Sequence, residues 1–126
     1  MPEAAPAAPS VVILADDLIW ATRLSDAITA AGARPRAARR LIDLERLLGP
    51  DADGDRLAII DLTARAYDGV EAVRVARGAG ARVVAVGQHD DVPLRRAALA
   101  AGAERVFTYR ALFENGARTL ASWLAT

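Results

Sequence analysis

The sequence predicts an α/β domain in which helices cover both faces of a parallel β-sheet. Short apolar segments alternate with amphipathic segments five times along the 126 residues, which is the pattern of successive strand–helix units. The apolar segments at residues 11–15, 57–60 and 83–86 are continuous rather than alternating. Continuous apolar runs of this length are typical of strands that are buried on both faces, as the strands of a parallel sheet are.

The first two strand–helix units contain one edge of this sheet. A strand at residues 11–15 is followed by a helix at residues 19–31, whose apolar residues recur at helical spacing up to a glycine stop. We expect a second strand at residues 34–39, where Pro35 and several arginines suit an edge because one side of the backbone needs no partner. Leucines at helical spacing predict a helix at residues 40–48.

The third unit follows a polar turn of glycine, proline and aspartate. Its strand, at residues 57–60, ends on Asp61, and the pair Asp68 and Gly69 opens a helix that closes at Gly78. Function in parallel sheets lies in the crevice outside the carboxyl ends of the strands. The aspartate that ends this strand is therefore a candidate functional residue.

The last two units complete the sheet. Pro93 suits the first position of a helix, because its missing N–H would have no partner there, and Gly102 caps the same helix after residues 94–101. The remaining elements are two strands and a final helix, at residues 82–86, 104–108 and 111–124.

Composition excludes several kinds of chemistry. All 16 basic residues are arginine, so the chain has no lysine for Schiff-base chemistry. It has no cysteine, which excludes disulfides and thiolate metal sites. The 16 acidic residues bring the formal net charge to zero, which argues against general binding to nucleic acids.

The same composition favours one cytoplasmic domain. Residues 1–10, which are rich in alanine and proline, are expected to be a disordered tail, and residues 11–126 to form a single domain. No stretch approaches the roughly 18 uninterrupted apolar residues of a membrane span. The opening segment also lacks the charge and apolar pattern of a signal peptide.

Acidic residues gather where two of the strands end. Asp16 and Asp17 follow the first strand, and Asp61 follows the third. If these strands are neighbours, three carboxylates converge, and they repel one another unless a cation or protons offset their charge. Carboxylate oxygens suit Mg²⁺, so we expect weakly bound magnesium at these three residues.

Three short runs occur at a characteristic mutual spacing: ADD at residues 15–17, LAIIDLTARAYDG at residues 57–69 and GAE at residues 102–104. With these runs the chain resembles, over roughly residues 11–124, the receiver domain of two-component response regulators. The first run matches the family's acidic pair, and the second matches its phosphoacceptor segment, including the Asp-Gly that begins its third helix. The third run matches the turn before its fifth strand.

The resemblance implies a fold and a chemistry. The implied fold is a flavodoxin-like, doubly wound sheet of five parallel strands in the order 2-1-3-4-5. By the same resemblance Asp16 and Asp17 would bind Mg²⁺, and Asp61 would be the nucleophile that accepts a phosphoryl group. A metal would neutralise the carboxylates and the incoming phosphoryl oxygens together.

Several positions depart from the family's pattern. The Thr or Ser after the fourth strand is Gly87 here, and the aromatic switch residue of the fifth strand is Val106. Tyr109 and Arg110 stand in place of the family's Lys and Pro. We expect Tyr109 to cover the pocket; the alternative is that it donates a hydrogen bond to a carboxylate. The groups that read a phosphoryl group are therefore absent, while the metal-binding acids remain.

These departures favour an atypical receiver, or pseudo-receiver. We expect a protein-interaction module in signalling or transcriptional control that is independent of phosphorylation or depends on it weakly. The alternative is a working receiver that accepts a phosphoryl group on Asp61 with Mg²⁺ in a phosphorelay. A metal-dependent phosphatase-like enzyme is disfavoured, because Ala64 offers no general acid or base near Asp61 and Thr63 offers only a weak hydroxyl contact.

Two surfaces are candidates for the protein partner. Leu18 and Ile19 are expected on the rim of the pocket. Arg110 and Phe113 belong to the face made of the fourth helix, fifth strand and fifth helix, through which receivers dimerise. We favour this second face, because it can pair isologously in a homodimer.

Overall fold

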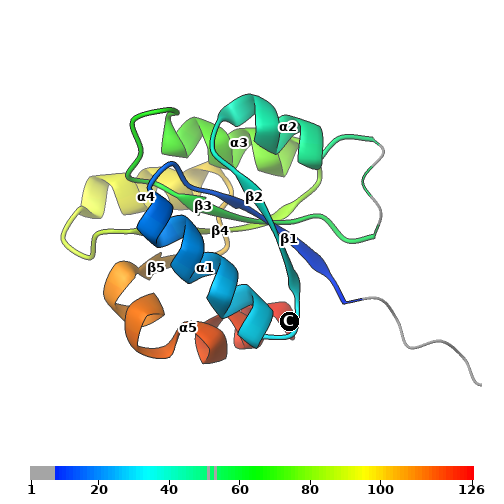
Figure 1. The fold of residues 1–126 in the computed structure, drawn as a ribbon. Helices are drawn as coiled ribbons and strands as arrows, with labels where there is room; N and C mark the ends of the chain where they lie inside the picture. The colour runs from blue at the N-terminus through cyan, green and yellow to red at the C-terminus, as the bar shows by residue number, and fades with distance from the viewer. Residues whose placement is uncertain (1–7, 51, 53) are drawn as a thin grey trace, which may run out of the picture.

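The computed structural model describes residues 8–50, 52 and 54–126, which form a five-stranded parallel sheet and five helices (Figure 1). The strand order is β2-β1-β3-β4-β5, as the sequence predicts. Because β2 pairs only with β1, the strand that contains Pro35 is indeed an edge. The strands are β1 Ser10–Leu14, β2 Arg34–Ala38, β3 Leu57–Asp61, β4 Arg82–Gly87 and β5 Val106–Thr108.

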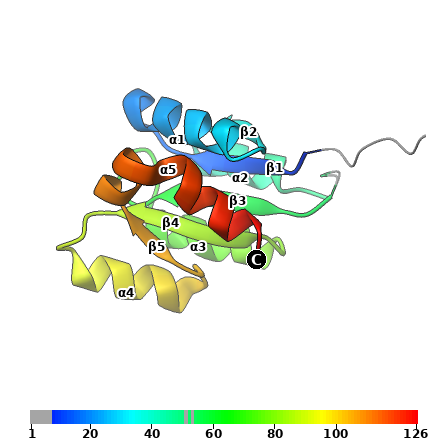
Figure 2. The ribbon, with the colours of Figure 1, turned by 90° about the horizontal axis from the view of Figure 1, so that it is seen from below.

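The helices form one layer on each face of the sheet. Figure 2 shows α1 and α5 on one face and α2, α3 and α4 on the other. This arrangement explains the continuous apolar runs, since successive residues of β1 enter opposite core layers. Val11 and Ile13 pack with α1 and α5, whereas Val12 and Leu14 pack with α2 and α3. The helices are α1 Leu18–Ala30, α2 Leu41–Leu47, α3 Gly69–Gly78, α4 Val92–Ala101 and α5 Tyr109–Leu124.

Side-chain caps decide where four of the helices begin. The side chains of Asp17, Asp68, Asp91 and Thr108 each accept a backbone N–H from the first turn of α1, α3, α4 and α5, at 3.0 to 3.1 Å. Such a cap contributes about 1 kcal/mol, because the first amides of a helix otherwise lack a partner. The caps Asp17, Asp68 and Asp91 end loops at the carboxyl edge of the sheet, so they also help to position the loops of the candidate site.

Some boundaries differ from the expected ones. Ser10, which was assigned to the tail, is the first residue of β1, and residues 1–7 lie outside the described part of the chain. The Asp91 cap starts α4 at Val92, which makes Pro93 its second residue rather than its first. The Thr108 cap starts α5 two residues earlier than predicted.

The last helix contains a kink. Asn115 has φ −141° and ψ 37°, so the helix is interrupted between its leading turn and the longer part that follows. Gly116 comes next and faces α1 closely, since a Cβ at this position would lie 3.2 Å from the Cβ of Ala27. The longer part is therefore held against α1 by close packing.

No helix in the described part of the chain is both long enough and apolar enough to cross a membrane.

Candidate functional site

The carboxyl ends of β1, β3 and β5 place three groups of interest at one edge of the sheet. Leu14 pairs with Ile60, so Asp16 follows the end of β1 beside the place where Asp61 ends β3. Tyr109 begins α5 directly after β5. Asp61 is 1% exposed and is the only charged residue that is fully buried in the described part of the chain. A carboxyl group in such a place needs donors close to it.

Two groups donate to the carboxylate of Asp61. The hydroxyl of Tyr109 donates to its Oδ1, and the backbone N–H of Thr63 donates to the same oxygen at 3.1 Å. Burial raises the pKa of Asp61 above its ordinary value, while the bonds from Tyr109 and Thr63 act in the opposite direction. Burial is the larger effect, so the site disfavours the negative charge of Asp61.

Tyr109 is fixed from both sides. Its ring packs against Trp20 of α1, with ring centroids 4.6 Å apart and planes inclined at 47°. Burial raises the pKa of Tyr109, and the hydrogen bond to Asp61 raises it further, so the hydroxyl keeps its proton. The sequence favoured a Tyr109 that covers the pocket over one that donates to a carboxylate, and the structure shows the donation.

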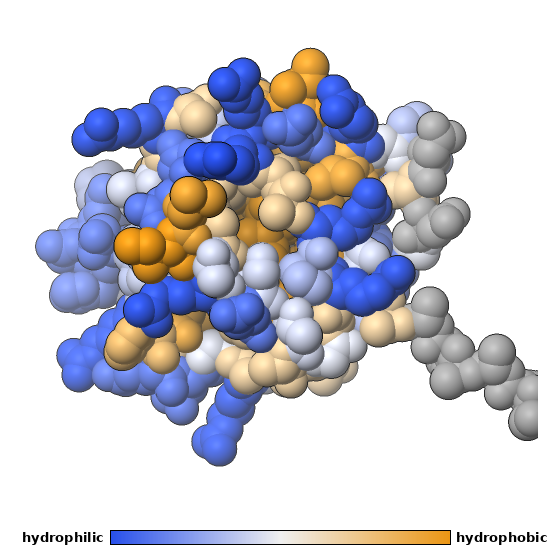
Figure 3. Space-filling view, in the orientation of Figure 1, coloured by the Kyte–Doolittle hydropathy of each residue, from blue (hydrophilic) through white to orange (hydrophobic). Residues whose placement is uncertain are grey.

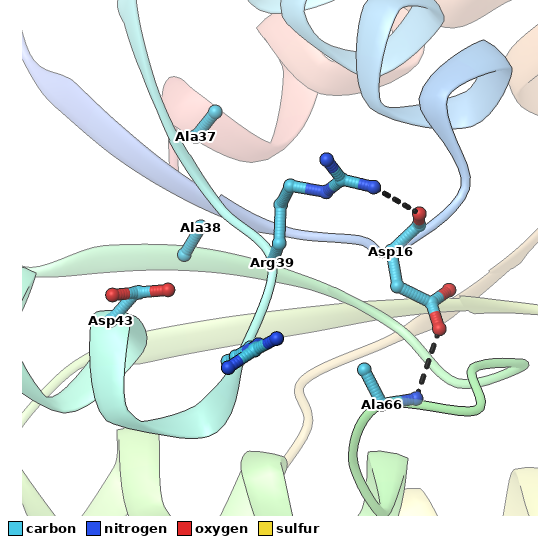
Figure 4. Close-up of a pocket in the computed structure, with 7 residues that line it drawn as sticks. Asp16, Ala37, Ala38, Arg39, Asp43 and Ala66 are labelled. Atoms are coloured by element: carbon cyan, nitrogen blue, oxygen red, sulfur yellow. Dashed lines mark hydrogen bonds between the residues drawn. The ribbon is translucent and has the colours of Figure 1, made fainter.

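Asp16 holds the loop that follows β3. Its Oδ2 accepts the backbone N–H of Arg65 at 2.8 Å and that of Ala66 at 3.0 Å, and Figure 4 shows the bond to Ala66. These bonds hold the pKa of Asp16 below its ordinary value, and the bond from Ala66 has the largest effect. The backbone oxygen of Asp16 also accepts from Arg39 at 3.3 Å.

The three aspartates therefore do three separate tasks. Asp17 caps α1 by accepting the N–H of Trp20, Asp16 holds a loop, and Asp61 accepts from Tyr109. Within the residues that the structure describes, no three His, Cys, Asp or Glu side chains form a group that could hold a metal ion. Magnesium at these acids stays a prediction, and an ion would have to compete with the donors that Asp16 and Asp61 already have.

The role of Tyr67 was not predicted from the sequence. Its buried hydroxyl lies 3.0 Å from the carbonyl oxygen of Leu14 and 2.7 Å from that of Asp61, so it fastens the ends of β1 and β3 together. Burial, and then the charge of Asp61, raise the pKa of Tyr67 well above its usual range. Only the aromatic residue type just before α3 hinted at this role, because the contact joins segments 53 residues apart.

At Gly87 and Val106, where the receiver family has a hydroxyl and an aromatic ring, the structure has close apolar packing instead. Gly87 ends β4, and a Cβ there would lie 3.3 Å from Cδ1 of Leu62. Val106 is 7% exposed and belongs to the same core layer as Leu62. Neither position offers a hydroxyl or an aromatic ring that could follow a change at Asp61.

Two cavities adjoin the site, and Asp16 lines both. One, of about 390 Å³, is lined by Asp16, Asp17, Thr63, Ala64 and Arg65, and Asp61 is not among these described lining residues. The other, of about 530 Å³, lies between β2 and α2 and is lined by both acidic and basic residues (Figure 4). Its lining residues are Asp16, Ala37, Ala38, Arg39, Arg40, Asp43 and Ala66.

The candidate interaction residues are all exposed. Leu18, Ile19 and Phe113 are 65%, 66% and 62% exposed, and Figure 3 shows hydrophobic surface over the start of α1. Arg110 forms an ion pair with Glu114 at 3.0 Å on the surface. The ring of Phe113 lies 4.6 Å from the guanidinium carbon of Arg23 in α1, so it borders the α1 side of α5.

A doubly wound parallel sheet of this order, with an aspartate buried at the end of β3, is the receiver fold. Solved structures bear this out. A response regulator from Thermotoga maritima superposes with a TM-score of 0.78 at 15% identity, covering 94% of this chain and 99% of its own. A response regulator receiver domain from Rhodospirillum rubrum gives 0.73 at 22% identity, covering 92% and 93%.

A third similar structure is described as the BeF3-activated DrrB receiver domain. It has a TM-score of 0.77 at 16% identity and covers 94% of this chain and 99% of its own. No protein-family model matches the sequence, and no curated protein does. The likeness at these identities establishes the fold, and the function has to be argued from the site.

Proposed function

We propose that this chain is a pseudo-receiver, a domain that binds a protein partner in signalling or transcriptional control and needs phosphorylation weakly or not at all. The observation that carries the proposal is the Tyr109 hydroxyl on the carboxylate of Asp61. The tyrosine stands where the resemblance expects a lysine. The acidic group that would accept phosphate is thus already engaged by a neutral donor.

The burial of Asp61 supports the same function. A nucleophilic carboxylate has to reach an incoming phosphoryl group, and Asp61 is 1% exposed beneath its neighbours. Tyr109 would have to leave before Oδ1 could react. The site also disfavours the charged form of Asp61, since burial raises its pKa, and the charged form is the nucleophile.

The positions around Asp61 support weak transmission. A ligand shifts an equilibrium between two conformations only when it makes different contacts in each. Gly87 has no side chain with which to make such a contact, and Val106 is packed in the core. The proposal includes no enzymatic turnover and no direct nucleic-acid binding, in keeping with a net charge of zero.

The second candidate is a working phosphoacceptor that uses Mg²⁺. It is favoured by Asp61 at the end of β3 with Asp16 beside it, and by the likeness to a BeF3-activated receiver domain. Were a magnesium ion bound, it would supply charge neutralisation for an incoming phosphoryl group. In that case Asp16, Asp17 and Asp61 would hold it, after Tyr109 had released Asp61.

Beryllofluoride with Mg²⁺ tests the two candidates. We expect backbone amide spectra of the wild-type chain to change little, because Tyr109 occupies Asp61 and no group reads the adduct. The double variant Gly87→Thr/Tyr109→Lys restores a hydroxyl and an ammonium group, each worth about 1.5–3 kcal/mol as a charge-assisted contact. Its apparent affinity for beryllofluoride should rise by about tenfold or more.

The control is Asp61→Asn, which cannot form the adduct in either background. A saturable spectral change in the wild-type chain that spreads to α4 and α5, and disappears in Asp61→Asn, would make the second candidate the function. If the double variant also fails to respond to beryllofluoride, the restored hydroxyl and ammonium groups are not enough to let Asp61 form the adduct.

A further inference from the structure

We propose that Tyr109 is a positioning residue that ties the leading turn of α5, residues 109–114, to α1 and thereby presets the surface around Phe113. The inference rests on the pseudo-receiver function and adds to it how the partner surface is held in one conformation. A continuous set of contacts and a kink in the helix carry it.

The contacts run from the buried carboxylate to the surface. The hydroxyl of Tyr109 is held by Asp61, and its ring lies on Trp20 of α1. The guanidinium of Arg23, one turn further along α1, lies 5.9 Å from the ring of Trp20 and 4.6 Å from the ring of Phe113. The aromatic pair and the two cation–π contacts are all stabilising interactions, and together they join α1 to the leading turn.

The spacing along α5 places both aromatic residues toward α1. Tyr109 and Phe113 are four residues apart, so they lie on one side of the turn. Tyr109 is half-buried against Trp20, while Phe113 is exposed beyond Arg23. Moving Tyr109 would therefore move Phe113 with it.

The kink allows the leading turn to move without the rest of α5. Asn115 has non-helical dihedral angles, which interrupts the helix directly after Glu114. Beyond it Gly116 packs closely on Ala27, and Leu120 and Trp123 are buried. Residues 109–114 also include Leu112, which is 7% exposed and packs in the same core cluster as Leu120 and Trp123, so a shift of the turn about Asn115 stays small. Hinges are commonly a few residues at the end of an element.

The bond to Asp61 is the buried polar contact of the leading turn, and it acts beside the apolar packing of Leu112. It is a hydrogen bond to a buried carboxylate, whereas the contacts of Arg23 with the two rings lie at the surface, where such pairs contribute less. Any group placed on Oδ1 of Asp61, whether a metal or a phosphoryl group, displaces the Tyr109 hydroxyl. The partner surface is thus formed while Asp61 is unmodified.

Amide hydrogen exchange and the indole signal of Trp20 test this inference in the full chain. Tyr109→Phe keeps the ring on Trp20 and removes only the hydroxyl. We expect exchange at residues 112–114 to quicken by about tenfold or more, since one charge-assisted hydrogen bond is lost. The Trp20 indole signal should shift, while exchange at residues 117–124 should stay within about twofold.

Two further variants separate positioning from a general loss of stability. Tyr67→Phe removes another tyrosine hydroxyl from the same cluster but not from α5, so exchange at residues 112–114 should rise no more than elsewhere. Asp61→Asn keeps an oxygen that accepts from Tyr109, so the leading turn should stay protected. Asp61→Ala removes the acceptor and should reproduce the effect of Tyr109→Phe.

Unchanged exchange at residues 112–114 in Tyr109→Phe, or an equal rise in Tyr67→Phe, would overturn the inference. Loss of protection over the whole of α5 would overturn the hinge at Asn115. These results are distinct from a failure of the proposed function, which would show itself as a strong response of the wild-type chain to beryllofluoride.

Discussion

At the scale of single residues, the site is a set of carboxylates that each have their own donors. The sequence was enough to place Asp16, Asp17 and Asp61 at strand ends on one edge of the sheet, and the strand order that the resemblance implied made those ends neighbours. The sequence could not decide that Tyr109 donates to Asp61 rather than covering the pocket, since that bond joins residues 48 positions apart and depends on the rotamer of each. Nor could it show that backbone amides surround Asp16.

This difference reverses one expectation about stability. Crowded carboxylates would make the metal-free protein more stable when Asp16 loses its charge. In the structure two amides lower the pKa of Asp16, so Asp16→Asn should instead lower the free energy of unfolding, because charged acceptors bind amides more strongly. The site is partly open to solvent, which screens the charge, so we expect less than about 1 kcal/mol. Thermal or urea unfolding at pH 7 without metal measures the change.

Asp61→Asn is the matched variant and should act in the opposite direction. It keeps an acceptor oxygen for Tyr109 and removes a charge that burial disfavours. We expect an increase in unfolding free energy on the order of 1 kcal/mol. If both variants lower stability to the same extent, the two sites do not differ in the way described.

At the scale of elements, strands were easier to predict than helix starts. Continuous apolar runs located β1, β3 and β4, because each strand is buried on both faces. The start of α5 was missed, since Thr108 suits a strand as well as a cap until its hydroxyl is seen to accept the N–H of Ala111. The kink at Asn115 has no clear signal in the sequence.

The end of α5 depends on an ion pair that is sensitive to acid. Arg82 of β4 donates to both carboxylate oxygens of Glu104 at 3.0 Å and also reaches the side chain of Thr126 at 2.9 Å. The hydrogen bonds from Arg82 hold the pKa of Glu104 below 4.5, its ordinary value. Glu104 therefore contributes stability above about pH 4.5, and this contribution is lost as the pH falls through the lower folded-state pKa.

Glu104→Gln should abolish that acid dependence. The two side chains are 34% and 36% exposed, so we expect a difference from the wild type of less than about 1 kcal/mol at pH 7. The difference should shrink toward pH 3. Urea unfolding at both pH values measures it, and a difference that grows on acidification would contradict the assigned role.

At the scale of the whole molecule, the chain presents two separate surfaces. One is the apolar rim at Leu18 and Ile19 where α1 begins. The other contains Arg110 on α5, on the face that also includes α4 and β5. Phe113 lies between them, since it contacts Arg23 of α1. Under the proposed function, we expect the partner to bind one of these surfaces, and its binding to be independent of the charge of Asp61.

Self-association distinguishes the two surfaces. If a homodimer forms through the face of α4, β5 and α5, Arg110→Glu should weaken it by about tenfold or more, because arginines are frequent hot spots and the new acid faces Glu114. Leu18→Asp should have little effect, and Asp61→Asn none. Sedimentation velocity measures the association, and dissociation by Leu18→Asp alone would move the interface to the rim.

The separate tasks of the three aspartates bear on how such a domain evolves. One carboxylate caps a helix, one holds a loop and one anchors a tyrosine, and none of these tasks needs a metal or a phosphate. Loss of the helix cap or of the amide contacts would lower stability by up to about 1 kcal/mol each, and removal of the acceptor would free the tyrosine. Domains of this size have little stability to spare. Selection for folding alone would then retain Asp16, Asp17 and an acceptor oxygen at position 61, and an asparagine at position 61 would support folding at least as well as the acid.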